Sequence, residues 1–118
     1  MAKQEKIDDR YKFKLTPKQK KAIKWNKEAI EENLLANGLY KEPFITMGNR
    51  WIEMLITCYE LEEDIQLRGV QVYDLGRKTF KKNDSVSLLT NTNKQMLILL
   101  RDLNISADKV DKEEGQDL

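Results

Sequence analysis

Seven lysines gather near the start of the chain, between residues 12 and 27, and Tyr11, Phe13 and Trp25 are interleaved with them. Flexible cations at several points along one segment suit the phosphates of a nucleic-acid backbone. The cluster consists of Lys12, Lys14, Lys18, Lys20, Lys21, Lys24 and Lys27. The sequence therefore predicts a phosphate-binding segment here, with an ordinary solvated helix face as the alternative.

A second group of cations lies further along the chain, around residue 80. Four cations fall within six residues, which is too many for all of them to be buried in a small domain. We expect these side chains to be exposed and to form a second candidate contact with DNA phosphates. The group consists of Arg77, Lys78, Lys81 and Lys82.

The sequence offers no catalytic or metal-binding set of residues. It contains no histidine, and its single cysteine, Cys58, has no cationic neighbour on its helix face to activate the thiol. Glu60, Glu63 and Asp64 lie close together, but three acids near the end of a charged helix are typical of a solvated face. The glycines are isolated, so no phosphate-binding loop is predicted. We expect a non-enzymatic protein that uses no metal ion or cofactor.

Composition and charge narrow the fold class. With 118 residues, 40% hydrophobic and 35% charged, the chain is long enough for one small domain and typical of a helical protein. Residues 1–28 hold ten Lys or Arg against four Asp or Glu, and residues 29–69 hold three against eight. Residues 70–105 are basic again, with six against three, and residues 106–118 are acidic, with two against five. Different segments are therefore expected to face different partners.

Start and stop signals divide residues 15–105 into helices and one hairpin. Thr16-Pro17 is typical of a helix start, and Asn37-Gly38 is typical of a helix end. Beyond the second helix the apolar residues alternate around a glycine turn, which predicts a β-hairpin. The expected fold is mainly α: a helical hairpin, a small β-hairpin insert and a third helix. The expected bounds are about 17–37, 44–68 and 84–103 for the helices and about 70–82 for the β-hairpin.

The two ends of the sequence differ from this central domain. Residues 1–14 are polar, mixed in charge and without periodicity, which predicts a flexible arm. Residues 106–118 are acidic and almost without apolar side chains, which predicts a disordered tail. Because its acids repel phosphate, we expect the tail to engage a protein partner and not DNA, with a plain solubility tail as the alternative.

The helix expected over 44–68 is apolar around more than half of its circumference. Its polar residues form one narrow stripe that includes Asp64 and Arg68, so the rest of the helix must be covered from at least two sides. So few other elements are available that a second copy of the chain is expected to help. Trp51, Leu55, Cys58 and Tyr59 are expected to face the subunit's own helices. The candidates for contact between subunits are Met47, Met54 and Leu61.

The helix expected over 84–103 also places its apolar residues on one side. Thr92 and Asn93 interrupt that side. Its expected core-facing residues are Val86, Leu88, Leu89, Met96, Leu97, Leu99, Leu100 and Leu103.

Taken in order, these elements resemble the small subunits of bacteriophage terminases, over the range from about residue 15 to residue 105. The resemblance is carried by the order of elements and by the local sequences between and within them. Those sequences are a Gly69-Val70 break, an Asp74-x-Gly76 turn, an Asn83-Asp84-Ser85 helix start and a last helix ending in NKQMLILLRDLNIS.

The resemblance implies a function that the composition of the chain does not indicate by itself. Terminase small subunits are non-catalytic proteins that assemble into rings, bind the packaging site on double-stranded viral DNA and present it to the large subunit. The large subunit carries the ATPase and the nuclease. By this resemblance the chain is a homo-oligomeric DNA-packaging protein of the host cytoplasm, with DNA and the terminase large subunit as partners and no membrane contact.

Two other classes of protein are compatible with the sequence. One is a small dimeric transcriptional regulator, which would need base-reading Arg, Asn or Gln side chains on an exposed helix, whereas the first helix offers mainly Lys and Glu. The other is a helical adaptor that binds only proteins and binds no nucleic acid at any salt concentration. A dimer would favour the regulator, and a ring of many copies would favour the terminase subunit.

Overall fold

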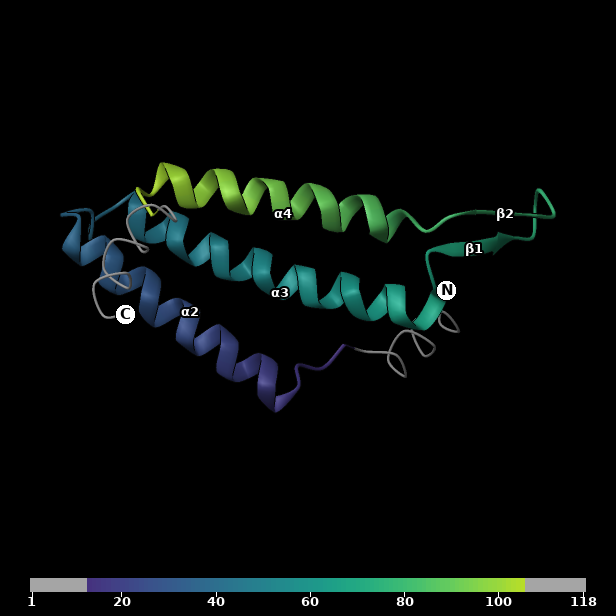
Figure 1. The fold of residues 1–118 in the computed structure, drawn as a ribbon, viewed down its shortest axis with the longest axis horizontal. Helices are drawn as coiled ribbons and strands as arrows, with labels where there is room; N and C mark the ends of the chain where they lie inside the picture. The colour runs from purple at the N-terminus through teal and green to yellow at the C-terminus, as the bar shows by residue number, and fades with distance from the viewer. Residues whose placement is uncertain (1–12, 106–118) are drawn as a thin grey trace, which may run out of the picture.

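The computed structural model describes residues 13–105, which form three helices and one two-stranded antiparallel sheet (Figure 1). The expectation of a mainly helical fold with a small β-hairpin is confirmed. The flexible arm and acidic tail expected at the two ends fall largely on residues 1–12 and 106–118, which lie outside the described residues. The elements are α2 (Pro17–Ala36), α3 (Phe44–Arg68), β1 (Gln71–Asp74), β2 (Thr79–Lys82) and α4 (Asp84–Asp102).

Helix α2 starts and ends at the signals predicted for it. The Thr16 hydroxyl accepts a hydrogen bond from the Gln19 backbone N–H at 3.1 Å, and the Gln19 side chain accepts one from the Thr16 backbone N–H at 2.9 Å. Pro17 occupies the first turn, where its missing N–H costs nothing. At the other end Asn37 caps the helix and Gly38 adopts a φ of 72°, a left-handed conformation that glycine reaches without strain.

Helix α3 lies between the other two helices and packs against both (Figure 1). Gly48 allows the close approach of α2, because a Cβ atom at this position would lie 3.0 Å from Ile30 Cγ2 and 3.6 Å from Leu34 Cδ1. The sequence expectation that α3 needs cover on two sides is thereby met within one subunit for part of its surface. The buried core consists of Ile30, Leu34, Trp51, Ile52, Cys58, Met96 and Leu103.

Helix α4 departs from its expected packing at two residues. Leu88 is 53% exposed and Leu97 is 67% exposed, although both were expected on the core side. The reason is geometric: α4 contacts the body mainly through α3, and a single neighbouring helix covers only a narrow stripe of it. Met96 and Leu99, by contrast, belong to the core or pack against it.

The two strands form a narrow ribbon that connects the end of α3 to the start of α4. Tyr73 pairs with Phe80 in the antiparallel register, and their rings meet edge to face with centroids 5.3 Å apart. Figure 1 shows the ribbon extending beyond the helices, along the long axis of a body that measures 56 × 28 × 28 Å. Among the described residues, no helix combines the length and the hydrophobicity that a membrane span requires.

Candidate nucleic-acid interface

The first half of α2 carries the first predicted basic cluster on an open surface. Between residues 14 and 27 the chain has six lysines and no acid. Trp25, in the same stretch, is 61% exposed, and the Lys21 ammonium lies 5.9 Å from the centroid of its ring. The structure exposes Lys14, Lys18, Lys20, Lys21, Lys24 and Lys27, whereas Lys12 lies outside the described residues.

This half of α2 is more open because Ile23 is its one residue among the apolar side chains that form the described core or pack against it. The buried residues of α2, Ile30 and Leu34, both lie in its second half, and in the first half Ile23 is only partly buried. Figure 1 shows α2 diverging from α3 toward its N-terminus. The result is a helical segment whose cations project into solvent.

None of these lysines is neutralised by a described carboxylate. Within residues 13–105 the ion pair between Asp64 and Arg68 is the only one, with Arg68 Nε 2.6 Å from Asp64 Oδ1. Helix α2 also has no acid in its first turn, so the partial positive charge of the helix N-terminus adds to that of the lysines. An anionic partner would therefore meet unpaired charge along the whole first half of the helix.

The ribbon presents the second predicted group of cations. Asp74 Oδ1 accepts hydrogen bonds from the backbone N–H groups of Gly76 at 2.9 Å and Arg77 at 3.3 Å, and these bonds shape the turn. Lys78 takes the left-handed conformation, with a φ of 53°, and completes the turn. Arg77 and Lys78 in the turn and Lys81 and Lys82 on β2 are all exposed, as expected.

The pairing register divides the ribbon into two faces. Gln71, Tyr73, Phe80 and Lys82 share one face, because cross-strand partners and alternate residues point the same way. On this face Tyr73 is 50% exposed and Phe80 is 66% exposed, so an aromatic pair sits beside a cation in the open. The other face carries Val72 and Lys81, which are paired with each other.

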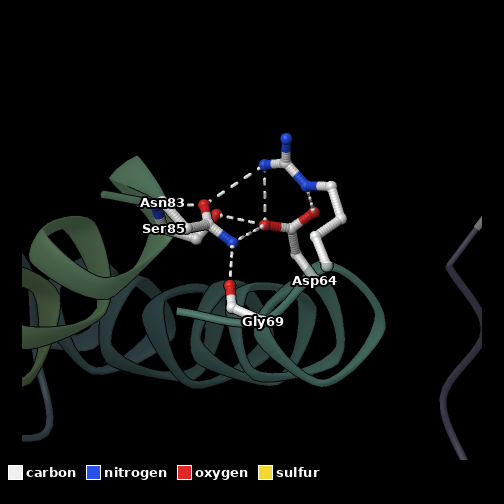
Figure 2. A network of polar contacts seen from close by, with 5 residues as sticks. Asp64, Gly69, Asn83 and Ser85 are labelled. Carbon is white, nitrogen blue, oxygen red and sulfur yellow. Dashed lines mark hydrogen bonds and ion pairs between the residues drawn. The ribbon is translucent and has the colours of Figure 1, made fainter. Parts of the chain in front are cut away.

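A network of hydrogen bonds around Asp64 fastens the base of the ribbon to α3 and α4 (Figure 2). Asp64 Oδ2 accepts from Ser85 Oγ at 2.6 Å, from Arg68 Nη2 at 2.9 Å and from Asn83 Nδ2 at 3.1 Å. Asn83 Nδ2 also donates to the Gly69 carbonyl at 2.9 Å. We call these five residues, Asp64, Arg68, Gly69, Asn83 and Ser85, the ribbon clamp.

Asn83 is the centre of the ribbon clamp and is fully buried. Its Oδ1 accepts from the Ser85 backbone N–H at 3.0 Å, which caps α4, and from Arg68 Nη2 at 3.2 Å. Its backbone N–H donates to the Val70 carbonyl at 2.8 Å. Every polar group of this side chain is therefore satisfied, as burial requires.

The ribbon clamp shifts the pKa of Asp64. The hydrogen bonds from Arg68, followed by those from Ser85 and Asn83, hold the pKa of this carboxyl far below its ordinary value, while partial burial acts in the opposite direction. The same contact with Asp64 raises the pKa of Arg68. Asp64 is therefore ionised at neutral pH.

The sequence placed Asp64 and Arg68 on the solvent stripe of α3. Arg68 is exposed as expected, whereas Asp64 is only partly exposed and is held by the ribbon clamp. Their spacing of four residues indicates an ion pair on one helix face. The participation of Asn83 and Ser85 was not foreseen, because it depends on where the ribbon returns to the helix. The predicted helix start at Asn83 was the one sequence signal for this site. It explains the capping bond of Asn83 Oδ1 but not the hydrogen bonds that Nδ2 donates to Asp64 and Gly69.

The candidate residues for contact between subunits occupy the flanks of α3. Met47 is 36% exposed, whereas Met54 and Leu61 are partly buried. Met54 lies in a groove between α3 and α4 together with exposed Leu88. A hollow lined by Trp51 and exposed Leu97 is also present, and the buried Trp51 Nε1 has no acceptor among the described residues.

Cys58 is a core residue. It is 3% exposed, and its Sγ lies 3.4 Å from Asn93 Oδ1 and 3.6 Å from Met96 Sδ. Burial, followed by the charge of Glu62, raises the pKa of the thiol, which keeps it in the unreactive neutral form. In the described part of the chain, no group of three or more Cys, Asp or Glu side chains is arranged to hold a metal ion.

The two basic groups therefore lie on separate elements that are attached to the body in different ways, one on a projecting helix and one on a clamped ribbon. Their side chains suit phosphate, and the aromatic residues beside them offer flat apolar surface. No protein-family model matches the chain, and neither the curated proteins nor the solved structures include one of significant similarity to it.

Proposed function

We propose that this protein is a non-catalytic, DNA-binding subunit of a phage packaging terminase, which binds double-stranded DNA as an oligomer and presents it to the ATPase and nuclease subunit. The observation that carries the DNA-binding part is the projecting first half of α2, with its exposed lysines and no described carboxylate paired to any of them. The order of the elements, a helical hairpin followed by a ribbon and a last helix, supports the terminase part.

Phosphate is the partner that suits this surface. Lysines on successive turns of a rigid helix can meet several phosphates of one duplex, and each contact releases a counterion. The absence of acids between residues 14 and 27 removes the repulsion that an anionic backbone would otherwise meet. The proposed contacts of these lysines are with phosphates, and such contacts position the protein on DNA without carrying sequence information themselves.

The ribbon would supply a second contact. A two-stranded antiparallel ribbon is narrow enough to enter the major groove of B-form DNA. The cations Arg77 and Lys78 at its turn are placed to meet phosphates, and Tyr73 and Phe80 lie on one exposed face. Two separate contacts on one subunit hold DNA more firmly than either alone, and repetition in an oligomer multiplies the effect.

Self-association is supported by apolar surface that one subunit leaves open. Leu88 and Leu97 of α4 are both more than half exposed. The unpartnered indole N–H of Trp51 beside Leu97 would gain a hydrogen bond if a second molecule brought an acceptor to this hollow. Met47, Met54 and Leu61 remain the proposed contact residues on α3.

The decisive test replaces Lys18, Lys20 and Lys21 with Glu in one variant. Affinity for double-stranded DNA should fall about 100-fold, and the slope of log affinity against log salt should decrease by about 0.9 per lost phosphate contact. Fluorescence anisotropy with labelled duplex at several salt concentrations measures both quantities.

The matched control reverses three exposed cations away from both basic groups, Lys41, Lys94 and Arg101, and so changes the total charge equally. It should reduce affinity only slightly. If the α2 variant binds DNA as tightly as the control does, α2 is not the DNA-binding element and the ribbon becomes the leading candidate. Light scattering of the parent protein tests the assembly, and a monomer at micromolar concentration would contradict it.

A further inference from the structure

The acidic segment 106–118 begins next to the helix that carries the lysines. Asn37, which caps the end of α2, donates a hydrogen bond from Nδ2 to the Asn104 carbonyl at 3.2 Å. Leu103 is 1% exposed and Ile105 packs against the core, so the point of departure is fixed. Nothing in the sequence alone placed residue 105 beside residue 37.

From this point the segment is long enough to reach the basic half of α2. At about 1.5 Å per residue, the lysines from Lys27 to Lys18 lie about 15 to 29 Å from Asn37 along the helix. A chain leaving Asn104 advances at most about 3.3 Å per residue, so residue 114 can reach about 33 Å. The cations of the ribbon are a poorer target, because α4 alone separates its two ends by about 28 Å.

The net charge of the segment is opposite in sign to the charge of the first half of α2. Going back from Asn37, α2 presents first three glutamates and then only lysines. The segment holds five Asp or Glu against two Lys, and its Asp111, Glu113 and Glu114 have a reach of about 23 to 33 Å, far enough to lie over the lysines of α2. The glutamates of α2 are Glu28, Glu31 and Glu32, about 8 to 14 Å from Asn37.

We propose that residues 106–118 fold back along α2 of their own chain, place their acids on its unpaired lysines and so compete with DNA for this surface. The competition rests on the proposed DNA-binding function, whereas the docking does not. Because exposed ion pairs are individually weak, the segment should be docked only part of the time. A linker this short gives an effective concentration in the millimolar range, so a contact with a Kd of about 1 mM would be occupied about half the time.

Exposed Trp25 gives a readout that needs no DNA. Acrylamide should quench Trp25 in preference to buried Trp51, which is only 9% exposed. In the full chain, Asp111→Asn, Glu113→Gln and Glu114→Gln together should free the first half of α2. At low salt the quenching constant should then rise by up to about twofold, and DNA affinity should rise by about twofold, since half of the molecules were blocked before.

A control with the same change in net charge neutralises three exposed acids on α3: Glu53→Gln, Glu60→Gln and Glu62→Gln. It should leave quenching unchanged. The difference between the parent and the 106–118 variant should vanish in about 0.5 M salt, where exposed ion pairs are screened. Trp25→Phe should remove the signal.

Equal quenching of the parent and the 106–118 variant at low salt would overturn the docking, whether or not the protein binds DNA. A difference that grows with protein concentration would also overturn it, because the segment would then come from a second copy. If quenching changes while a measurable DNA affinity does not, the competition is overturned. A parent that binds no DNA at all would refute the proposed function and leave the quenching result to decide the docking.

Discussion

The two basic regions of this protein are attached to it in opposite ways. The ribbon joins two helices at a base where buried Asn83 and ionised Asp64 satisfy each other and their neighbours. The first half of α2 has no such base, and its direction depends on the packing of Ile30 and Leu34 in the other half of the same helix. Polar bonds therefore place one set of cations, and apolar contacts place the other. Different substitutions should therefore destabilise the two regions.

Gly48→Val should have the largest effect on stability, and it should act on α2 alone. Its side chain would collide with Ile30 Cγ2, which a Cβ atom would already approach to 3.0 Å, so α2 must move away from α3. We expect a loss of about 2 to 3 kcal/mol in the free energy of unfolding, typical of overpacking. Urea unfolding measures this loss. Relative to the parent protein, hydrogen exchange should become faster in α2 but not in the ribbon. Glu53→Val, at an exposed position of the same helix, should cost less than 1 kcal/mol.

Asp64→Ala should act on the other region. It leaves buried Asn83 and the Ser85 hydroxyl each without one partner, and we expect a loss of about 1.5 to 2 kcal/mol because charge-assisted hydrogen bonds are removed. Exchange should accelerate in β1 and β2 but not in α2. Glu60→Ala, one turn earlier on α3 and exposed, is the matched control. Equal exchange in the two variants would mean that the ribbon clamp does not hold the ribbon.

Acid should weaken the parent protein through the same group. The folded-state pKa of Asp64 is depressed, so its contribution to stability is complete above the unfolded pKa of about 4 and is lost as pH falls below that value. Stability measured between pH 6 and pH 3, at values about one unit apart, should therefore fall less steeply in Asp64→Ala than in the parent. If stability falls equally steeply with pH in the parent and in Asp64→Ala, Asp64 is not the group responsible for the acid dependence.

Thr16→Ala should have the smallest effect, and it again concerns α2. Loss of the capping box should cost about 1 kcal/mol, and the first turn, which carries Lys18 and Lys20, should fray. Circular dichroism should show a small loss of helix, and DNA affinity should fall by about twofold to fivefold if ordered lysines are needed. Thr90→Ala, an exposed position inside α4, should not change DNA affinity.

Local signals in the sequence were sufficient to find the elements. Thr16-Pro17, Asn37-Gly38 and the helix start at Asn83 act through the backbone of their own turns, so they need no knowledge of the rest of the fold. The alternation of apolar residues after Gly69, which predicted the ribbon, is likewise a local pattern. The cations of the two basic groups were predicted to be exposed, and the structure agrees for all of those it describes.

What could not be predicted depends on which elements meet. Helical periodicity shows that Leu97 lies near an apolar face, but not that α3 covers only a narrow stripe of α4 and leaves this side chain open. Asp64 has the same pattern as any surface acid, and only the return of the chain at Asn83 turns it into the anchor of the ribbon. The position of Asn104 beside Asn37 belongs to the same class of long-range contact.

The position of the ribbon clamp has a mechanical consequence, because the ribbon is held at one end, at Asn83, and any rotation there moves its turn through a larger distance. Strands of four residues extend about 13 Å from that point, so a tilt of about 10° at the base displaces the turn by about 2 Å. A displacement of that size exceeds the tolerance of the hydrogen bond that we propose between Arg77 or Lys78 and a phosphate oxygen. Small adjustments among Asp64, Asn83 and Ser85 would thus be amplified at the tip, where the cations are.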